Sequence, residues 1–215
     1  MRRIKKGLEP GACIAHRNAG AGAIFGNAPK DKMREALYAE QEGLCAYCMC
    51  ALKEATDAVM KVEHHVPQSV DDSLELVWSN LLGVCKGGEG LPRKQQTCDS
   101  RRGNRPIPFD PTDPAIERQI CYETRGRVFA ADPSEQPALD DVLGLNTDAP
   151  LRARESVLEA FLDCMKRSKP TGTWTAADYE AELARFRMTR NQRTRGFIGI
   201  VEWFVARRRR GSNAG

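Results

Sequence analysis

Apolar residues recur at helical spacing in the C-terminal third of the chain and predict three helices, over 151–167, 175–187 and 197–210. The apolar residues of the first helix share one face: Val157, Leu158, Phe161, Leu162 and Met165. The third helix carries a similar stripe: Ile198, Ile200, Val201, Trp203 and Phe204. Such a stripe either packs in the chain's own core or docks on a partner, and the sequence leaves both open.

The N-terminal part of the chain has shorter hydrophobic runs and fewer periodic segments. Residues 1–30 are rich in glycine and alanine, which predicts an irregular arm. A short helix is predicted over 31–42, where Asp31 is placed to cap the first turn and Gly43 to end the last. This helix leads directly into the first pair of cysteines.

Short strands and loops are predicted between the two helical parts. β-Branched and apolar residues over 59–67 predict a strand that stops at Pro67. Residues 74–82 predict a strand or a turn, whereas the glycines and charges of 86–97 predict an exposed loop. A small hairpin is predicted over 121–129. Strands followed by a run of helices indicate an α+β fold.

The 215 residues suffice for one core of ordinary size, or for a compact module followed by a smaller one. A change of character near 130–138 divides the chain into an expected core, 31–130, and a helical region, 138–210, that is expected to dock on a partner. The composition, 41% hydrophobic and 29% charged, is globular. No apolar run approaches the roughly 20 residues that span a bilayer, and no apolar signal-peptide core follows the basic N-terminus. We therefore expect a cytoplasmic protein without membrane contact.

The net charge of +4 is mild, but the arginines are unevenly distributed. They gather at three places: Arg101 with Arg102 and Arg105, the segment 185–195, and the run 207–210. Clustered arginines neutralise phosphates and release counterions, which makes binding to nucleic acid favourable and sensitive to salt. The alternative for each cluster is a solubilising surface.

Four of the eight cysteines have the spacing of a metal site. Cys45 and Cys48 are separated by two residues, so both thiolates can bind one zinc ion from a tight turn, and a tetrahedral zinc then needs two more ligands. Cys85 and Cys98 are the candidates, although twelve residues separate them. The alternatives are that these two belong to the core, or that Cys50 replaces one of them. Disulfides are not expected in a reducing compartment.

A second group of chemically active residue types lies within this cysteine pattern. Glu63 directly precedes His64, with a proline three residues after the histidine, and a leucine follows Asn80. Asp99 and Arg102 come after the last of the four cysteines. At these residues the sequence resembles the HNH endonuclease family. That family's pattern is an acid-histidine pair followed by proline, then Asn-Leu, then Cys-His-x-x-Lys, often braced by cysteine pairs on zinc. The resemblance implies a ββα-metal core.

The residue types suit the steps of phosphodiester hydrolysis. A neutral His64 is a suitable base for the attacking water near pH 7, and the side-chain carbonyl of Asn80 can hold its ring in one orientation. Glu63 and Asp99 offer hard oxygen donors for Mg²⁺ or Mn²⁺. Arg102 can hold the phosphate through two parallel hydrogen bonds.

The sequence departs from the HNH pattern at several positions. Glu63 stands where aspartate is commoner, and Arg102 where lysine is usual. Asp99 replaces the family's final histidine, which is expected to favour Mg²⁺ or Mn²⁺ over softer ions. His65 occupies a position that is usually apolar, so His65 stays an alternative to His64 as the base.

The chain also resembles one HNH subfamily, the retron-associated or Septu-type nuclease subunits of bacterial antiphage systems. The resembling parts are 1–6 with Pro10, 41–48, the pairs Glu63-His64 and Cys98-Asp99, and the downstream segments 143–146 and 151–154. Such nucleases work with an ABC-type ATPase, so the resemblance implies that partner for the C-terminal helices. Nucleic acid is the expected substrate, DNA before RNA. Two alternatives stay open: a zinc-knuckle protein that binds nucleic acid without cutting it, and a stand-alone HNH restriction enzyme.

Overall fold

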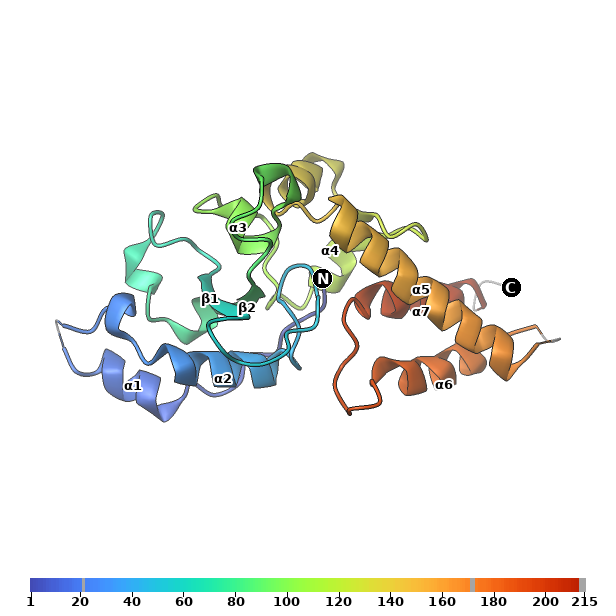
Figure 1. The fold of residues 1–215 in the computed structure, drawn as a ribbon, viewed down its shortest axis with the longest axis horizontal. Coiled ribbons are helices and arrows are strands. Elements are labelled where there is room, and N and C mark those ends of the chain that lie inside the picture. The colour runs from blue at the N-terminus through green and yellow to red at the C-terminus, as the bar shows by residue number, and fades with distance from the viewer. Residues whose placement is uncertain (21, 171–172, 213–215) are drawn as a thin grey trace.

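Residues 1–20, 22–170 and 173–212, which this computed structural model describes, fold into helices and two small antiparallel sheets (Figure 1). The predicted α+β class is confirmed. The helices are α1 (Gly11–Arg17), α2 (Lys30–Glu40), α3 (Cys98–Arg102), α4 (Ile116–Gln119), α5 (Asp148–Ser168), α6 (Ala176–Arg187) and α7 (Gly199–Ser212). The strands are β1 (Met60–His64), β2 (Leu81–Cys85), β3 (Ile120–Tyr122) and β4 (Val128–Ala130).

The N-terminal arm, residues 1–30, is less irregular than predicted. It contains helix α1, and its first residues reach the hydrophobic core, where Met1 and Ile4 are buried. The amide of Ile4 donates to the carbonyl of Pro111 at 2.7 Å. The local composition of the arm does not reveal this order, because the apolar surface that buries Met1 and Ile4 belongs to distant parts of the chain.

Helix α2 confirms the helix predicted over 31–42. Asp31 does not cap it: the carboxylate lies in the first turn and pairs with Arg34 at 2.7 Å. An acidic residue there still interacts favourably with the helix dipole. The helix ends before Gly43, whose left-handed backbone (φ +71°) lets the chain turn into the cysteine segment.

Strands β1 and β2 pair in antiparallel fashion, with Met60 opposite Cys85 and His64 opposite Leu81. The predicted strand was expected to continue to Pro67, but β1 ends at His64. The reason is that Asn80 captures the next two amides, one with its backbone carbonyl and one with its side chain. The chain therefore leaves the sheet directly after His64.

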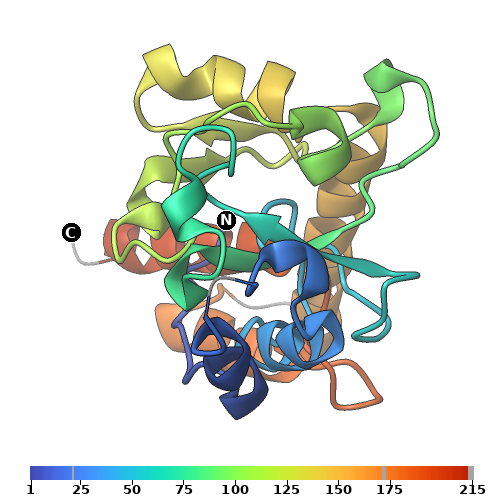
Figure 2. The same cartoon turned by 90° about the vertical axis from the view of Figure 1, so that its left-hand side faces the viewer.

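Helices α2 and α3 both pack against this sheet, and Figure 2 shows the two strands between them. The strand predicted within 74–82 begins later, because a 3₁₀ turn occupies Trp78–Asn80 and β2 follows it. Gly83 in β2 allows close packing, since a Cβ atom there would lie 2.1 Å from Cε of Met60. The buried side chain of Gln41 accepts from the Gly83 amide at 2.6 Å and donates to its carbonyl at 2.7 Å.

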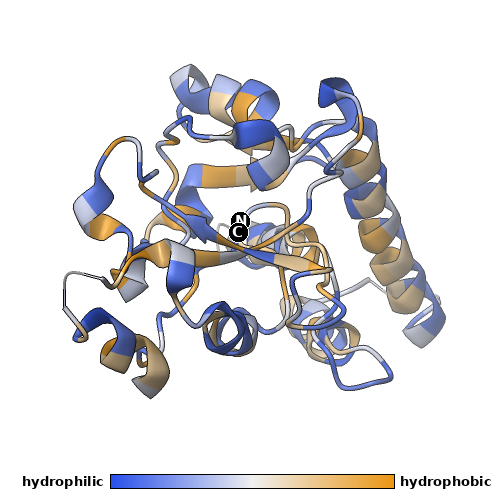
Figure 3. Cartoon of the chain, turned by 60° about the vertical axis from the view of Figure 1, so that its left-hand side comes forward, coloured by the Kyte–Doolittle hydropathy of each residue, from blue (hydrophilic) through white to orange (hydrophobic). Residues whose placement is uncertain are grey.

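The helical region confirms the three predicted helices and the preceding hairpin, which is formed by β3 and β4. Apolar and polar positions alternate along the long helix α5 (Figure 3). Its predicted core face is buried at Leu158, Phe161 and Met165 and half-buried at Val157 and Leu162. Helix α7 starts later than predicted because Phe197 has a left-handed backbone (φ +58°).

The apolar stripe of α7 packs in the chain's own core. Its most buried members are Ile198, Ile200, Val201 and Phe204. Trp203 is half-buried and stacks edge-on against Tyr122, at 6.1 Å between ring centroids. Of the two uses that the sequence left open for this stripe, core packing is the one observed. Docking on a partner stays a prediction for the half-buried part of this face.

Buried apolar residues of the arm, the sheets and the helical region form one continuous cluster. The division between 31–130 and 138–210 accordingly stays a prediction about roles, because both parts share this core. Within the described ranges, none of the helices combines the length and the apolar character that crossing a membrane requires.

Candidate metal centre and histidine site

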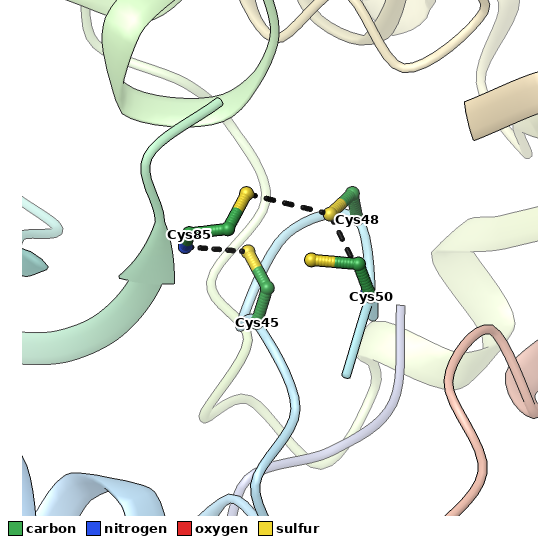
Figure 4. A group of neighbouring side chains, drawn as sticks. All are labelled: Cys45, Cys48, Cys50 and Cys85. Atoms are coloured by element: carbon green, nitrogen blue, oxygen red, sulfur yellow. Dashed lines mark hydrogen bonds between the residues drawn. The ribbon is translucent and has the colours of Figure 1, made fainter. Parts of the chain in front are cut away.

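Four cysteines gather where β2 ends beside the turn that follows α2 (Figure 4). They are Cys45, Cys48, Cys50 and Cys85, and their sulfur atoms all lie within 4.8 Å of one another. Such a group could bind a metal ion such as zinc. It contains three of the four predicted ligands. Its fourth member is Cys50, the alternative that the sequence left open.

The remaining predicted ligand, Cys98, reaches the same group from the first residue of α3. Its Sγ lies 3.8 Å from that of Cys45, and the Sγ atoms of Cys48 and Cys85 are also 3.8 Å apart. Zinc–sulfur bonds of about 2.3 Å place tetrahedral ligands about 3.8 Å from one another. These two pairs thus have the spacing of opposite edges of a zinc tetrahedron. With Cys50, five thiols surround a place where a zinc ion uses four.

Hydrogen bonds favour the thiolate form that metal binding needs. The backbone amide of Cys85 donates to Sγ of Cys45 at 3.3 Å, and the amide of Cys50 donates to Sγ of Cys48 at 3.4 Å. Burial by itself raises the pKa of Cys45, but hydrogen bonds with its four neighbouring thiols lower it well below its ordinary value. The same bonds to Cys45 raise the pKa of Cys48 and Cys98, so the thiols share their protons, and a divalent cation would favour the deprotonated form of each of its ligands.

Two carboxylates face each other on the sheet side of α3: Glu63 from β1 and Asp99 from the helix. Burial, followed by the charge of Asp99, raises the pKa of Glu63 to about 8, although Arg102 opposes the shift. Repelling oxygen donors of this kind fit a hard divalent cation such as Mg²⁺ or Mn²⁺. Each already has an internal cation: Glu63 accepts from Arg102 at 2.5 Å, and Asp99 accepts from Lys61 at 2.9 Å.

Arg102 does not occupy the position of a phosphate ligand. Its side chain is fully buried and its guanidinium donates to neighbours from several segments: the carboxylate of Glu63, the hydroxyl of Tyr47, and the backbone carbonyls of His64, His65 and Arg105. These bonds fasten α3 to the end of β1. In this structure the guanidinium is enclosed by its own chain, so the phosphate contact stays a prediction that requires Arg102 to leave these partners.

His64 lies at the end of β1 with its ring held on two sides. Its Nε2 is 3.0 Å from the carbonyl oxygen of Glu75, and the ring of Phe25 packs edge-on with centroids 4.4 Å apart. A carbonyl only accepts, so Nε2 carries the proton and the neutral ring has its lone pair on Nδ1. Burial lowers the pKa of His64, which keeps the ring neutral.

Asn80 does not hold the ring of His64 as predicted. Its Oδ1 accepts from the amide of Val66 at 2.7 Å, and its Nδ2 donates to the carbonyls of Val66 at 3.1 Å and Leu74 at 3.2 Å. Leu74 directly precedes Glu75, whose carbonyl fixes the histidine. Asn80 thus joins both ends of the loop around His64 and positions the ring through the backbone.

His65 has a different environment from His64. Its Nδ1 is buried and has no hydrogen-bond partner among the residues that the structure describes. Burial lowers the pKa of His65. Only this nitrogen is shown to be enclosed, and His65 as a whole is less buried than His64, so His65 stays the alternative to His64 as the base.

Several contributors to the site were not found from the sequence. Lys61 could have been, because it lies two residues before Glu63 in a strand and so shares its face. Glu75 contributes a backbone carbonyl, which no side-chain pattern reveals. Phe25 and Lys30 come from the arm and from the start of α2, and the Nζ of Lys30 lies 4.8 Å from the centroid of the Phe25 ring. Tertiary packing alone brings them to the histidine.

Compared with profiles of known protein families and with curated protein sequences, the chain matches none.

Proposed function

We propose that this chain is a metal-dependent nuclease of the HNH class that hydrolyses phosphodiester bonds. The observation that carries the proposal is the state of His64: its Nε2 proton is fixed on the Glu75 carbonyl, which leaves Nδ1 as a base. The order strand, strand, helix in β1, β2 and α3 supports the same reading, because it brings Glu63 and Asp99 together and Glu63 directly precedes this histidine in β1.

His64 supplies the base chemistry. Its Nδ1 takes a proton from a water molecule as the water oxygen forms a bond to phosphorus. The bond from phosphorus to the leaving sugar oxygen then breaks, and that oxygen takes a proton from solvent. The lowered pKa of His64 keeps the ring unprotonated at neutral pH, as a base requires. Asn80 and the Glu75 carbonyl keep the ring from turning during this transfer.

Glu63 and Asp99 are the residues that would hold Mg²⁺ or Mn²⁺. Such an ion stabilises the negative charge that develops on the phosphate and on the leaving oxygen. Between reactions Lys61 and Arg102 offset the charge of the two carboxylates. Arg102 also donates to the His64 carbonyl, so it couples the carboxylate pair to the strand end that carries the base.

Cations outside the carboxylate pair support a nucleic-acid substrate, with DNA proposed before RNA. Burial and then the charges of Arg93 and Arg101 lower the pKa of Arg105, which shows that these arginines crowd their positive charge at one place. Lys30, over the Phe25 ring, adds a positive charge near His64. Concentrated positive charge of this kind attracts a phosphate backbone.

Cleavage of plasmid DNA and of total RNA, with and without added Mg²⁺ or Mn²⁺, tests the proposal. The wild-type chain is expected to cut only with added metal, His64→Ala to lose at least a hundredfold in rate, and His16→Ala to cut like wild type. His16 is the matched control because it lies in the arm, on α1, outside the site. Equal cleavage by His64→Ala would overturn the assignment.

One observation favours a second function, in which the chain is a zinc-knuckle protein that binds nucleic acid without cutting it. Both candidate metal carboxylates are already paired with cations of the same chain. A gel-shift assay in parallel with the cleavage assay separates the two functions. Binding by wild type and by His64→Ala without any cleavage in either metal would establish the binding function instead.

We also propose that the chain is the effector subunit of a bacterial antiphage system with an ABC-type ATPase as its partner; the resemblance of segments outside the core supports this. Because most of the stripe of α7 is buried, the partner needs a surface that extends beyond it. A groove of about 1160 Å³ beside α7 is available, and Arg118, Trp203 and Arg207 are among its lining residues. Co-purification with an ATPase encoded next to the chain should yield a complex that Arg207→Glu weakens; separate elution would contradict the proposal.

A further inference from the structure

The thiol cluster contains one more sulfur than a tetrahedral zinc ion binds. Cys45, Cys48 and Cys85 are common to both sets that the structure assembles: one with Cys50 and one with Cys98. Both outer thiols hydrogen-bond to Cys45, since each contributes to lowering its pKa. The shared three thiols can therefore be completed to four from two sides.

Cys98 completes the set from α3. It is fully buried, and its backbone lies in the left-handed region at φ +51°, a conformation that is strained for a residue other than glycine. Its amide donates to the carbonyl of Leu143 at 2.8 Å. Strained residues persist where their surroundings require them, and here the backbone directs the thiol toward Cys45. A metal bound to Cys98 therefore tethers the start of α3.

Cys50 completes the set from the tight turn that already carries Cys45 and Cys48. Its carbonyl accepts from the amide of Cys45 at 3.0 Å, and its amide donates to Sγ of Cys48 at 3.4 Å. These bonds keep Cys50 beside the cluster whether or not its thiol binds the metal. Its side chain is less buried than that of Cys98, so it lies on the outer side of the cluster.

We propose that Cys45, Cys48 and Cys85 hold one zinc ion together with either Cys98 or Cys50, and that exchange between these two releases α3 from the metal without loss of the ion. In the exchange one zinc–sulfur bond breaks as another forms, and the departing Cys98 thiolate takes up the proton that the Cys50 thiol gives up. The inference does not rest on nuclease activity, because it concerns only how the thiols share the ion.

Zinc content of purified variants tests the exchange. Cys50→Ser and Cys98→Ser are each expected to keep about one zinc per chain, and the double variant Cys50→Ser/Cys98→Ser to lose it. Cys164→Ser, a half-buried cysteine of α5 outside the cluster, is the matched control and should keep its zinc. Loss of zinc from either single variant, or retention by the double variant, would overturn the proposal.

Labelling of the wild-type protein gives a test that does not depend on the folding of variants. A thiol-alkylating reagent is applied to the zinc-loaded chain, and the labelled cysteines are located by mass spectrometry. Within the cluster we expect one label per chain, on Cys50 in some chains and on Cys98 in others, while the three shared thiols stay protected; labels on cysteines outside the cluster, such as Cys164, are counted separately. Labelling of Cys50 alone, or of Cys98 alone, would show a fixed set of ligands and would contradict exchange.

Hydrogen exchange at α3 tests the structural consequence. The amides of Cys98–Arg102 are expected to exchange at least several-fold faster in zinc-bound Cys98→Ser than in zinc-bound Cys50→Ser, because only the first variant has lost the tether. Equal rates in the two zinc-bound variants would show that the metal does not control α3.

Discussion

The thiol cluster and the carboxylate pair meet at α3, where Cys98 belongs to the first and Asp99 to the second, but they handle negative charge in opposite ways. The thiols receive hydrogen bonds from backbone amides and from one another. The carboxylates of Glu63 and Asp99 each pair with a cationic side chain of the same chain. One cluster leaves its charge for an added ion, whereas the other is compensated internally.

This difference separates a group on which folding depends from one on which the proposed activity depends. A cluster of buried thiolates is stable only with its ion, so binding free energy there becomes folding free energy. A compensated pair of carboxylates lets the chain fold before a divalent ion arrives. The same helix thus joins a cluster that could hold a structural ion to the proposed site, whose ion would be exchangeable.

Removal of the zinc ligand Cys45 is the strongest test of this contrast. Cys45→Ser is expected to lose most of the metal-binding free energy, which is on the order of 10 kcal/mol for structural zinc sites, and so to lose a cooperative thermal transition. Withholding Mg²⁺ from the wild type should change the melting temperature little. A Cys45→Ser variant that melts like Cys164→Ser would show that the thiols do not hold a structural ion.

Arg102→Met tests whether the carboxylate site is compensated from within. The substitution removes a fully buried cation and leaves Glu63 without its partner, which is expected to lower the free energy of unfolding by about 3–5 kcal/mol. The half-exposed Arg101, on the same helix, is the control, and Arg101→Met should change stability by less than about 1 kcal/mol. Urea unfolding measures both. Equal effects would mean that burial of Arg102 carries no special energy.

Sequence reasoning identified the cysteines that gather in the structure, whereas the contacts predicted for Asn80 and Arg102 differ from those observed. Cys-x-x-Cys spacing limits where a third and a fourth thiol can lie, so Cys85 and Cys98 could be predicted, and even Cys50 was recognised as an alternative. All four ligands of a zinc ion must meet at one point, so residue type and spacing nearly determine such a site.

The contacts of Arg102 and Asn80 could not be predicted in the same way. An arginine after an acid can bind a phosphate or a backbone carbonyl, and only its full burial decides between them. The Asn80 amide group could hold either the histidine ring or nearby backbone, and in the structure it bonds to the backbone of Val66 and Leu74. The strand and helix positions followed from periodicity, whereas the order of the arm depended on distant apolar surface.

The protonation of Glu63 makes the stability of the folded chain depend on pH. Its pKa is about 8 in the folded chain and near its ordinary value of 4.5 in the unfolded chain. The folded state therefore binds this proton more tightly, so the stability that it contributes is full below about 4.5 and is lost as the pH rises through about 8. Glu63→Gln should remove this decline, which is on the order of 5 kcal/mol for a shift from 4.5 to about 8. Melting temperatures across this range measure it, and parallel curves for wild type and variant would contradict it.

Lys30→Met has the smallest expected effect on stability. It tests whether a cation outside the ion pairs of Glu63 and Asp99 contributes to the site around His64. Lys30 contacts the Phe25 ring, and among the residues that the structure describes no carboxylate pairs with it. Its loss should therefore change stability by less than about 1 kcal/mol. Lys32→Met, on the same turn, is the control, because Lys32 already pairs with Glu35 at 2.8 Å.

The informative measurements are the pKa of His64 and the salt dependence of nucleic-acid binding. The charge of Lys30 helps to lower the pKa of His64, after larger effects of burial and of neighbouring groups, so Lys30→Met should raise that pKa slightly in an NMR titration. If Lys30 also contacts a phosphate, the slope of log affinity against log salt should fall by about 1. A raised pKa of His64 with an unchanged salt slope would show that Lys30 acts on the histidine and does not contact a phosphate. Changes of the same size in Lys32→Met would show that neither effect depends on the place of Lys30 beside Phe25.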